Sequence, residues 1–365
     1  MNICFINSGF ERHGGIERVV SILVGELANR KNLHIFSVSL YSGGGTLVYP
    51  ISEAVRMDAL FPHPLNMRKA LLKGAVSKLK KYLWEHRIDV VVACGILYYP
   101  LACAAGKKAG AKVICWEHTN PAVTCDFRFA GISRKYGAKR SDVNVLISEA
   151  GLSYYRRHFP KAKNVLIHNP ADTALFEGTT AYNPDNRKLI SVGRITYAKN
   201  YPLLIDIAAR VLPHHEGWTW DIYGDGNTRA ELEEKISALN LEGRVILKGN
   251  VADIYDRYPQ YSALVLTSRY EGFPMVLIEG AAKGLPLVSF DIETGPREII
   301  ENGINGFLIP NGNTDAMVET LNLLINDTEL RCRMSPKAAD TARRYDLSRI
   351  ADEWEQCFQN LMKIK

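Results

Sequence analysis

The sequence predicts an α/β protein with two doubly wound parallel-sheet domains. Its 365 residues are more than one ordinary domain holds, so two separate hydrophobic cores are expected. Short apolar runs alternate with amphipathic stretches along the chain, which is the pattern of parallel strands joined by helices on both faces of a sheet. A polar stretch without hydrophobic period, residues 177–187, divides this alternation into two halves of similar length.

Two series of apolar runs are interpreted as strands. In the first half they are Ile3–Asn7, His34–Leu40, Val90–Ala93, Lys112–Trp116, Asn144–Ile147 and Asn164–Ile167. In the second half they are Lys188–Val192, Thr219–Tyr223, Val245–Lys248, Ala263–Thr267, Leu287–Phe290 and Gly306–Ile309. The stretches between them predict helices, for example Glu17–Asn29, Leu203–Leu212 and Arg229–Ala238.

The domain organisation follows from these two series. An N-terminal domain is predicted over residues 1–172 and a C-terminal domain over residues 173–345. A final helix over residues 346–365 is expected to pack back on the N-terminal domain. Because ligands bind at the carboxyl ends of the strands in open parallel sheets, functional residues are expected directly after strands.

Charge and cysteine content restrict the partners and the compartment. Residues 1–180 carry 24 lysines and arginines against 13 acidic residues, whereas residues 181–365 carry 21 against 26. A basic first half fits nucleic acid, an anionic membrane surface, or a solvated face without a partner. Nucleic acid is the poorest of these, since the basic residues lack interleaved aromatic side chains. The sequence contains seven cysteines, an odd number, and no CxxC motif, which indicates reduced thiols. No signal peptide is visible either, so a cytoplasmic protein is expected.

The segment from Ser268 to Gly284 carries the densest group of candidate site residues. Pro274 suits a first helical turn, so the amides after it are expected to be free to bind a diphosphate. Glu271 at the loop is placed to hold a sugar by its hydroxyls, and Glu279 in the helix to hold the two hydroxyls of a ribose. The predicted binding residues of this segment are Glu271, Gly272, Phe273, Pro274, Met275, Val276 and Glu279.

Two cations follow the strand predicted at Lys188–Val192. Gly193 lets the backbone turn, and Arg194 and Lys199 come directly after it. Fixed positive charges at this place can neutralise a diphosphate leaving group as its bond to a sugar breaks. The nucleobase is expected near the main chain of Asn250 and Val251.

Two segments of the first half are further candidates. Gly14 and Gly15 permit close backbone approach after the first strand, and Glu17 starts a helix, but the pattern is not a GxGxxG fingerprint. His118 and Asn120 follow the strand predicted at Lys112–Trp116, where His118 could contact a sugar hydroxyl or orient an acceptor. The alternative for His118 is a structural histidine with satisfied hydrogen bonds.

Together these segments resemble family-4 retaining glycosyltransferases of the GT-B fold. The spacing of Glu271 and Glu279 is similar to the family's two-glutamate motif, and the family places an arginine and a lysine, here Arg194 and Lys199, on the donor diphosphate. Family members also carry Glu-His-x-Asn where this chain has Glu117, His118 and Asn120. The segment from Phe290 to Pro310 resembles bacterial members that use UDP-hexoses or UDP-N-acetylhexosamines in cell-surface polysaccharide assembly.

The resemblance implies two Rossmann-like domains that face each other across a cleft. It also implies transfer, with retention, of a hexose or N-acetylhexosamine from a nucleotide diphosphate, UDP by preference, to a glycan or polyprenyl-diphosphate-linked acceptor of lipopolysaccharide or capsule synthesis. The implied catalytic residues are Glu271, His118, Arg194 and Lys199; donor contacts add Gly14, Gly15, Asn250 and Val251, and acceptor or sugar contacts add Glu17 and Asn120. No cofactor or metal is expected, since the sequence has no Asp-x-Asp and no zinc-ligand spacing.

Three alternatives stay open. The chain could be a catalytically silent nucleotide-sugar-binding partner of an assembly complex, or a UDP-sugar epimerase of the same architecture. The third concerns a helix predicted over Met67–Arg87, with apolar positions Leu72, Val76, Leu79 and Leu83. This stripe is either core or, with the lysines beside it, a peripheral contact with the inner face of an anionic membrane.

Overall fold

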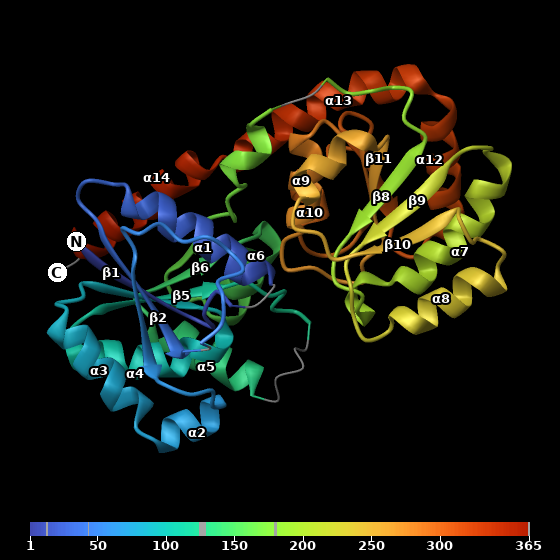
Figure 1. Ribbon diagram of the computed structural model, residues 1–365. Coiled ribbons are helices and arrows are strands. Elements are labelled where there is room, and N and C mark those ends of the chain that lie inside the picture. Colours follow the sequence, from blue (N-terminus) through green and yellow to red (C-terminus); the bar gives the residue numbers. More distant parts are fainter. Residues whose placement is uncertain (12–13, 43, 124–128, 179–180, 364–365) are drawn as a thin grey trace. The chain divides into compact units, whose positions relative to one another are not determined.

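The computed structural model describes residues 1–11, 14–42, 44–123, 129–178 and 181–363 (Figure 1). It divides into two compact units, which we call unit 1 (Met1–Pro170 with Leu347–Lys365) and unit 2 (Ala171–Asp346). Each unit is built on one parallel sheet with helices on both faces. The predicted fold class is therefore confirmed.

The sheet of unit 1 contains seven parallel strands. They are β1 (Asn2–Asn7), β2 (His34–Tyr41), β3 (Arg56–Phe61), β4 (Val90–Cys94), β5 (Lys112–Glu117), β6 (Val143–Leu146) and β7 (Asn164–Leu166). Their order is β3-β2-β1-β4-β5-β6-β7. Because β1 pairs with both β2 and β4, the winding reverses between β1 and β4, and this point of the sheet is where ligands bind in such folds.

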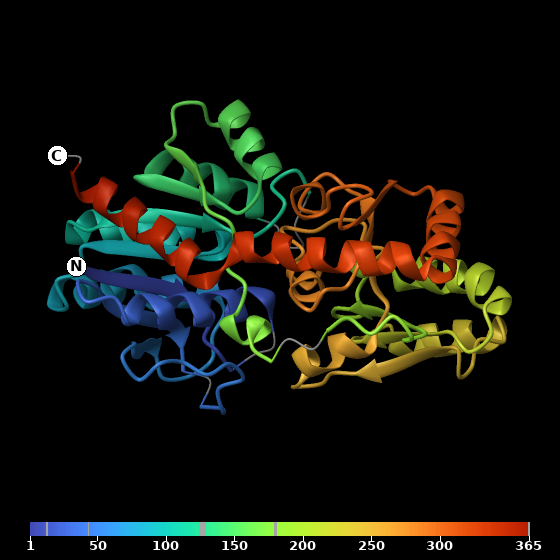
Figure 2. The same ribbon diagram turned by 90° about the horizontal axis from the view of Figure 1, so that it is seen from above.

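The helices of unit 1 cover both faces of its sheet. They are α1 (Gly15–Ala28), α2 (Met67–Leu72), α3 (Ala75–Glu85), α4 (Tyr99–Ala109), α5 (Ala130–Arg140), α6 (Glu149–His158) and α14 (Leu347–Lys363), with a short 3-10 turn η1 (Ile96–Tyr98). Figures 1 and 2 show α14 lying beside α1 over the sheet, and the two helices are in contact. Trp354 of α14 is fully buried against Phe5 and Trp116, with ring centroids 6.2 and 4.7 Å away.

The sheet of unit 2 repeats the winding of the first. Its strands are β8 (Lys188–Val192), β9 (Thr219–Tyr223), β10 (Val245–Gly249), β11 (Ala263–Leu266), β12 (Leu287–Asp291) and β13 (Gly306–Pro310), in the order β10-β9-β8-β11-β12-β13. All neighbouring strands are parallel. The reversal here falls between β8 and β11, the strands that precede Lys199 and Glu271.

The helices of unit 2 complete two layers around this sheet. They are α7 (Tyr201–Val211), α8 (Arg229–Ala238), α9 (Ile254–Arg257), α10 (Met275–Ala282), α11 (Pro296–Ile299), α12 (Thr314–Asn326) and α13 (Thr328–Ala342). The 3-10 turns are η2 (Thr173–Phe176), η3 (Tyr197–Lys199), η4 (Leu212–His214), η5 (Tyr258–Gln260) and η6 (Arg343–Tyr345). Helix α7 contacts α8 and α12, whereas α10 contacts α13. The core joins buried side chains of α7 and α12 to those of the strands.

Two elements of unit 1 differ from the sequence prediction. Strand β3 was not predicted, because its residues form an edge strand that is largely exposed at Arg56, Met57 and Ala59. The single helix predicted over Met67–Arg87 is two helices, α2 and α3, separated at Gly74, whose φ of +79° ends the first.

The split assigns the apolar stripe of this segment to two different surroundings. Leu79 and Leu83 of α3 are buried in the core, whereas Leu72 of α2 is 81% exposed.

Within the described part of the chain, none of the helices combines the length and the hydropathy that crossing a bilayer requires. The cysteines that the structure describes are free thiols; Cys125 lies outside the described residues.

Candidate active site

The loops that follow β8 and β11 meet where the winding of the second sheet reverses. Lys199 ends the loop after β8, and Glu271 lies in the loop after β11. The Lys199 Nζ lies 2.7 Å from Glu271 Oε1, and both side chains are largely buried. The structure therefore brings together two predicted site residues that are far apart in the sequence.

The position of Lys199 depends on two unusual backbone conformations. Gly193 has a φ of +150°, and a Cβ there would lie 2.5 Å from Lys199 Cε, so the lysine stem occupies the space a side chain would need. Asn200, the cap residue before α7, has a left-handed φ of +55°. Thr267 Oγ1 donates to the Lys199 carbonyl at 3.2 Å, and Tyr201 OH donates to the Gly193 carbonyl at 3.0 Å. These bonds fix the backbone around the lysine, and its ammonium group is held by Glu271.

Glu271 is held by neighbours that the sequence prediction did not include. Ser268 Oγ donates to Glu271 Oε1 at 2.6 Å, and Thr294 Oγ1 donates to the Glu271 carbonyl. Lys199 binds the same oxygen, Oε1. Among the described residues, Oε2 is therefore the carboxylate oxygen available to the hydroxyls of a ligand.

Glu279 lies in the second turn of α10 and is 5% exposed. A carboxylate at such a place needs a polar partner, and Tyr258 OH donates to its Oε2 at 2.7 Å. Tyr258 belongs to η5, just before β11. No motif in the sequence distinguishes this tyrosine from the other sixteen, so only the structure connects it with the site.

The start of α10 differs in detail from the prediction. Pro274 is the cap residue rather than the first helical residue, and the helix begins at Met275. The Met275 amide donates to the Phe273 carbonyl at 3.0 Å, so it is not free as predicted. Val276, the second helical residue, occupies a position whose amide has no partner within an α-helix. Any anion at this end is thus expected to bind through Val276 rather than Met275.

The other residues predicted for unit 2 lie at the same edge of its sheet. Arg194 is exposed in the loop after β8, in the same connection as Lys199. Asn250 and Val251 follow β10 directly, and Asn250 is exposed. Gly272 and Phe273 belong to the loop between β11 and α10, where Phe273 is buried against Tyr345.

In unit 1, the glycine loop after β1 is built around Glu17. Ser8 Oγ donates to Glu17 Oε1 at 2.5 Å, and the Gly14 amide donates to Tyr49 OH at 3.2 Å. A Cβ at Gly14 would lie 2.0 Å from Glu17 Oε2, so the end of this side chain packs directly on the glycine, whereas a Cβ at Gly15 would meet nothing within 4 Å. His13, the residue before Gly14, lies outside the described residues.

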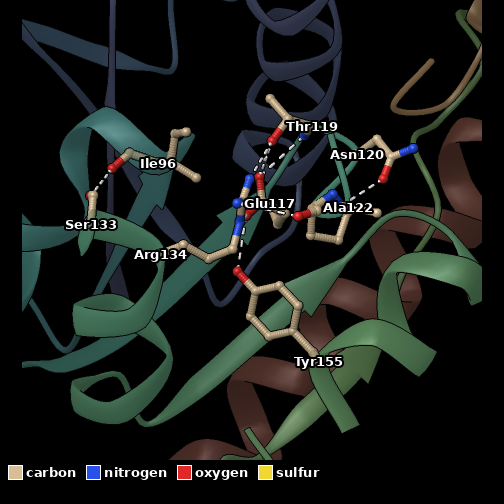
Figure 3. A network of polar contacts seen from close by, with 9 residues as sticks. Ile96, Glu117, Thr119, Asn120, Ala122, Ser133, Arg134 and Tyr155 are labelled. Atoms are coloured by element: carbon tan, nitrogen blue, oxygen red, sulfur yellow. Dashed lines mark hydrogen bonds and ion pairs between the residues drawn. The ribbon is translucent and has the colours of Figure 1, made fainter. Parts of the chain in front are cut away.

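The segment after β5 contains a buried charge network, drawn in Figure 3. Glu117 accepts from Arg134 Nε at 2.8 Å, from Thr119 Oγ1 at 2.5 Å and from Tyr155 OH at 2.9 Å. Asn120 Oδ1 accepts from the Ala122 amide at 2.9 Å, which shapes a turn. Glu117 is thus engaged within the protein, and it fixes the loop that carries His118.

His118 is buried, and among the described residues neither ring nitrogen has a hydrogen-bond partner. Its ring lies on Trp116, with centroids 4.2 Å apart. Burial lowers the pKa of His118 to about 3, so the imidazole is neutral at neutral pH. A structural histidine with satisfied hydrogen bonds does not fit this environment, because both ring nitrogens are buried without a partner among the described residues.

Acid is expected to destabilise unit 1 through His118. The folded-state pKa of about 3 lies below the ordinary value of 6.5, so between these values the unfolded chain binds the proton. The free energy of unfolding therefore rises with pH across this window, by up to about 1.4 kcal/mol per pH unit. Denaturant unfolding at pH 4 and pH 7 should show a smaller pH effect in His118→Leu than in the wild type. His34→Leu, at an exposed histidine of the same unit, is the control, and equal pH effects in all three proteins would contradict the assignment.

Acidic, histidine and cysteine side chains of the described residues form no group of three or more suited to a metal ion. The polar groups that converge after β8 and β11 are instead one ammonium, one carboxylate and hydroxyl donors. Such a set can bind sugar hydroxyls and stabilise a developing negative charge.

Two family models match consecutive parts of the chain. The model described as Glycosyltransferase Family 4 matches residues 13–175, and the model described as Glycosyl transferases group 1 matches residues 176–341. An uncharacterized glycosyltransferase of Haemophilus influenzae is 27% identical over 94% of this chain and 95% of its own length. The amylovoran biosynthesis glycosyltransferase AmsD of Erwinia amylovora is 28% identical over 95% and 96%. A Campylobacter jejuni N-acetylgalactosaminyltransferase, named for a diphospho-undecaprenol-linked saccharide, is 26% identical over 97% of both chains.

Solved structures share the fold. The lipopolysaccharide outer core galactosyltransferase WaaB, in its apo form, is similar with a TM-score of 0.77 and 22% identity over 99% of each chain. The Anabaena protein HepE, solved in complex with UDP, is similar with a TM-score of 0.80 and 19% identity over 99% of this chain and 100% of its own. This likeness shows the GT-B fold that the sequence predicted.

Proposed function

We propose a specific reaction for this chain, which belongs to the family-4 glycosyltransferases. Relatives that match most of its length are named for the synthesis of amylovoran and of lipopolysaccharide. The enzyme moves a hexose or N-acetylhexosamine from UDP to a glycan or a polyprenyl-diphosphate-linked acceptor, and the anomeric configuration is retained. It works in the cytoplasm, at the inner face of the membrane that holds such acceptors. The Campylobacter relative, named for a lipid-linked saccharide, supports this acceptor class.

The contact between Lys199 and Glu271 carries the proposal. It fixes an ammonium group and a sugar-binding carboxylate at the reversal of the second sheet, where a nucleotide ligand binds in doubly wound folds. An ammonium group has three donors, so Lys199 can keep its bond to Glu271 while it binds a phosphate oxygen. Glu279 on α10 provides a buried carboxylate for the ribose.

In the proposed mechanism, the bond between the anomeric carbon and the diphosphate oxygen breaks. Lys199 and Arg194 stabilise the negative charge that develops on the leaving UDP. The acceptor hydroxyl attacks the anomeric carbon from the same face, and its proton passes to the departing phosphate oxygen. Glu271 orients the sugar, and the neutral His118 donates or accepts one hydrogen bond to a sugar or acceptor hydroxyl. With two cations and the Val276 amide at the diphosphate, the reaction is proposed to need no divalent metal.

Donor binding provides a direct test in the absence of an acceptor. UDP is expected to raise the melting temperature of the wild type with the logarithm of its concentration, and more than GDP or ADP does. Glu279→Gln, which is isosteric but lacks the charge, is expected to weaken UDP binding about tenfold, the ratio that corresponds to about 1.4 kcal/mol. Tyr258→Phe removes the hydrogen bond to Glu279 but no proposed ligand contact, so its loss should be smaller. Equal stabilisation of the wild type and Glu279→Gln by UDP would contradict the ribose assignment.

Turnover separates the proposed reaction from the alternatives. With UDP-hexoses and a bacterial lipid extract as acceptor source, the enzyme should release UDP and form a longer lipid-linked saccharide. Without acceptor, no new nucleotide sugar should form, whereas an epimerase would produce one. A silent binding partner would be stabilised by UDP and would release none.

A further inference from the structure

An apolar groove of about 1400 Å³ opens in unit 1 at the reversal point of its sheet. Ser8 after β1 and the η1 turn after β4 line its inner end, and α2 and α5 contribute walls. The volume exceeds the 300–1,000 Å³ usual for small-molecule pockets. Most of the residues that line the groove are leucines, other aliphatic side chains, prolines and aromatic side chains. The described residues therefore form a large groove with a mostly apolar lining.

Large apolar side chains along this groove are exposed to solvent. Leu72 of α2, Ile132 of α5 and Phe129 just before α5 are 81%, 68% and 55% exposed. Contiguous apolar surface of this kind on a soluble protein marks a binding site. The break at Gly74 explains the arrangement, because it separates α2, which lines the groove, from α3, which packs in the core.

The polar residues that line the groove indicate which charge a ligand would carry beside its apolar part. The charged residues among those lining it are Arg68 and Lys69, and none of the lining residues that the structure describes is acidic. At the inner end, Ser8 both lines the groove and donates its hydroxyl to Glu17, the residue predicted to contact the acceptor. An amphipathic ligand with a long apolar part and an anionic group matches this distribution.

We propose that the groove binds the isoprenoid chain of a lipid-diphosphate acceptor, with Arg68 and Lys69 facing the diphosphate and the saccharide beyond Ser8. This inference rests on the proposed function and adds where unit 1 holds the lipid part of the substrate. A bilayer surface fits less well, because a flat surface reaches protruding side chains but not the concave lining at Ser8 and η1. The isoprenoid chain fills the groove. The side chains of Leu72 and Ile132, which are exposed in the free protein, then cover the isoprenoid from the solvent side.

The test measures the affinity of the full-length protein for farnesyl diphosphate, a water-soluble isoprenoid diphosphate, by isothermal titration calorimetry. Ile132→Glu places a negative charge in the groove at an exposed position, where folding tolerates it. Ile304→Glu is the matched control, since Ile304 is 50% exposed on unit 2. We expect Ile132→Glu to weaken binding of farnesyl diphosphate at least tenfold, with Ile304→Glu equal to the wild type. Inorganic pyrophosphate alone should compete at least tenfold more weakly than farnesyl diphosphate.

Each other outcome overturns the proposal. If the wild type does not bind farnesyl diphosphate, or if Ile132→Glu binds it as tightly as the wild type does, the groove does not hold the chain. The other explanation is a bilayer contact. It would be indicated if the wild type cosediments with anionic phospholipid vesicles, Ile132→Glu does not, and neither protein binds farnesyl diphosphate. Stabilisation by UDP is measured on the same samples and should be unchanged in Ile132→Glu, because Ile132 is not among the proposed donor contacts. A failure at the groove is thereby distinguished from a failure of the proposed function.

Discussion

Replacing Lys199 with alanine is expected to reduce the rate of sugar transfer at saturating donor by about 100- to 1000-fold. This range is typical for the loss of one preorganised group that stabilises developing negative charge in a largely dehydrated site. The Lys199 ammonium is fixed by Glu271 and by the backbone around Gly193, so neither water nor an exposed lysine can replace its geometry. Release of UDP in the presence of acceptor measures the effect.

The matched control is Lys235→Ala. Lys235 also forms an ion pair of 2.7 Å with a carboxylate of unit 2, Asp206, but on the surface of the unit. Its replacement should leave the rate within twofold of the wild type. Glu271→Ala should lower the rate as strongly as Lys199→Ala does, because it removes the sugar contact and the partner of the lysine. Near wild-type turnover in both variants would remove these residues from the mechanism.

Replacing Glu117 with alanine is expected to destabilise unit 1 by about 3–5 kcal/mol, the usual cost of leaving one member of a buried ion pair without its partner. Arg134 is 6% exposed, and its Nε loses its carboxylate partner in this variant (Figure 3). Tyr155 and Thr119 lose an acceptor at the same time. Hydrogen–deuterium exchange of peptides that cover β5 and β6 measures unit 1 separately from unit 2.

Two comparisons test the explanation. Glu353→Ala removes a partner from the surface pair with Arg349, and its cost should stay below about 1 kcal/mol because exposed pairs are weak. The double variant Glu117→Met with Arg134→Met should be more stable than Glu117→Ala, since it buries no unpaired charge. A double variant as unstable as the single one would mean that packing around Glu117, and not charge, determines the loss.

The strands of both sheets could be predicted because strands buried on both faces read as apolar runs. Strand β3 could not be predicted in this way, because it is not buried on both faces. At the edge of the sheet its first residues remain in water, so Arg56 and Asp58 occupy it without cost and no apolar run results. The break between α2 and α3 was also missed. The apolar spacing continues across Gly74, and a single glycine is tolerated in many helices.

The candidate site was partly predictable because strand order places the loops after β8 and β11 together. Glu271 and Lys199 were predicted as site residues from their positions after strands and from the family resemblance, and the strand order of the structure explains why they are neighbours. Their supporting residues could not be predicted. Tyr258 and Thr294 reach the site from other segments, and their contacts depend on side-chain directions that no spacing encodes. The environment of His118 likewise results from burial by separate elements.

Helix α14 imposes an order of events on synthesis at the ribosome. The face of the first sheet that carries Phe5 and Trp116 emerges early, but Trp354, which covers both, emerges only after all of unit 2. Until then this aromatic surface lacks its cover and is open to water or to a chaperone. Completion of the nascent N-terminal unit thus waits for the translation of the other unit, and any ribosome that stalls before Leu347 leaves a product with an open hydrophobic face.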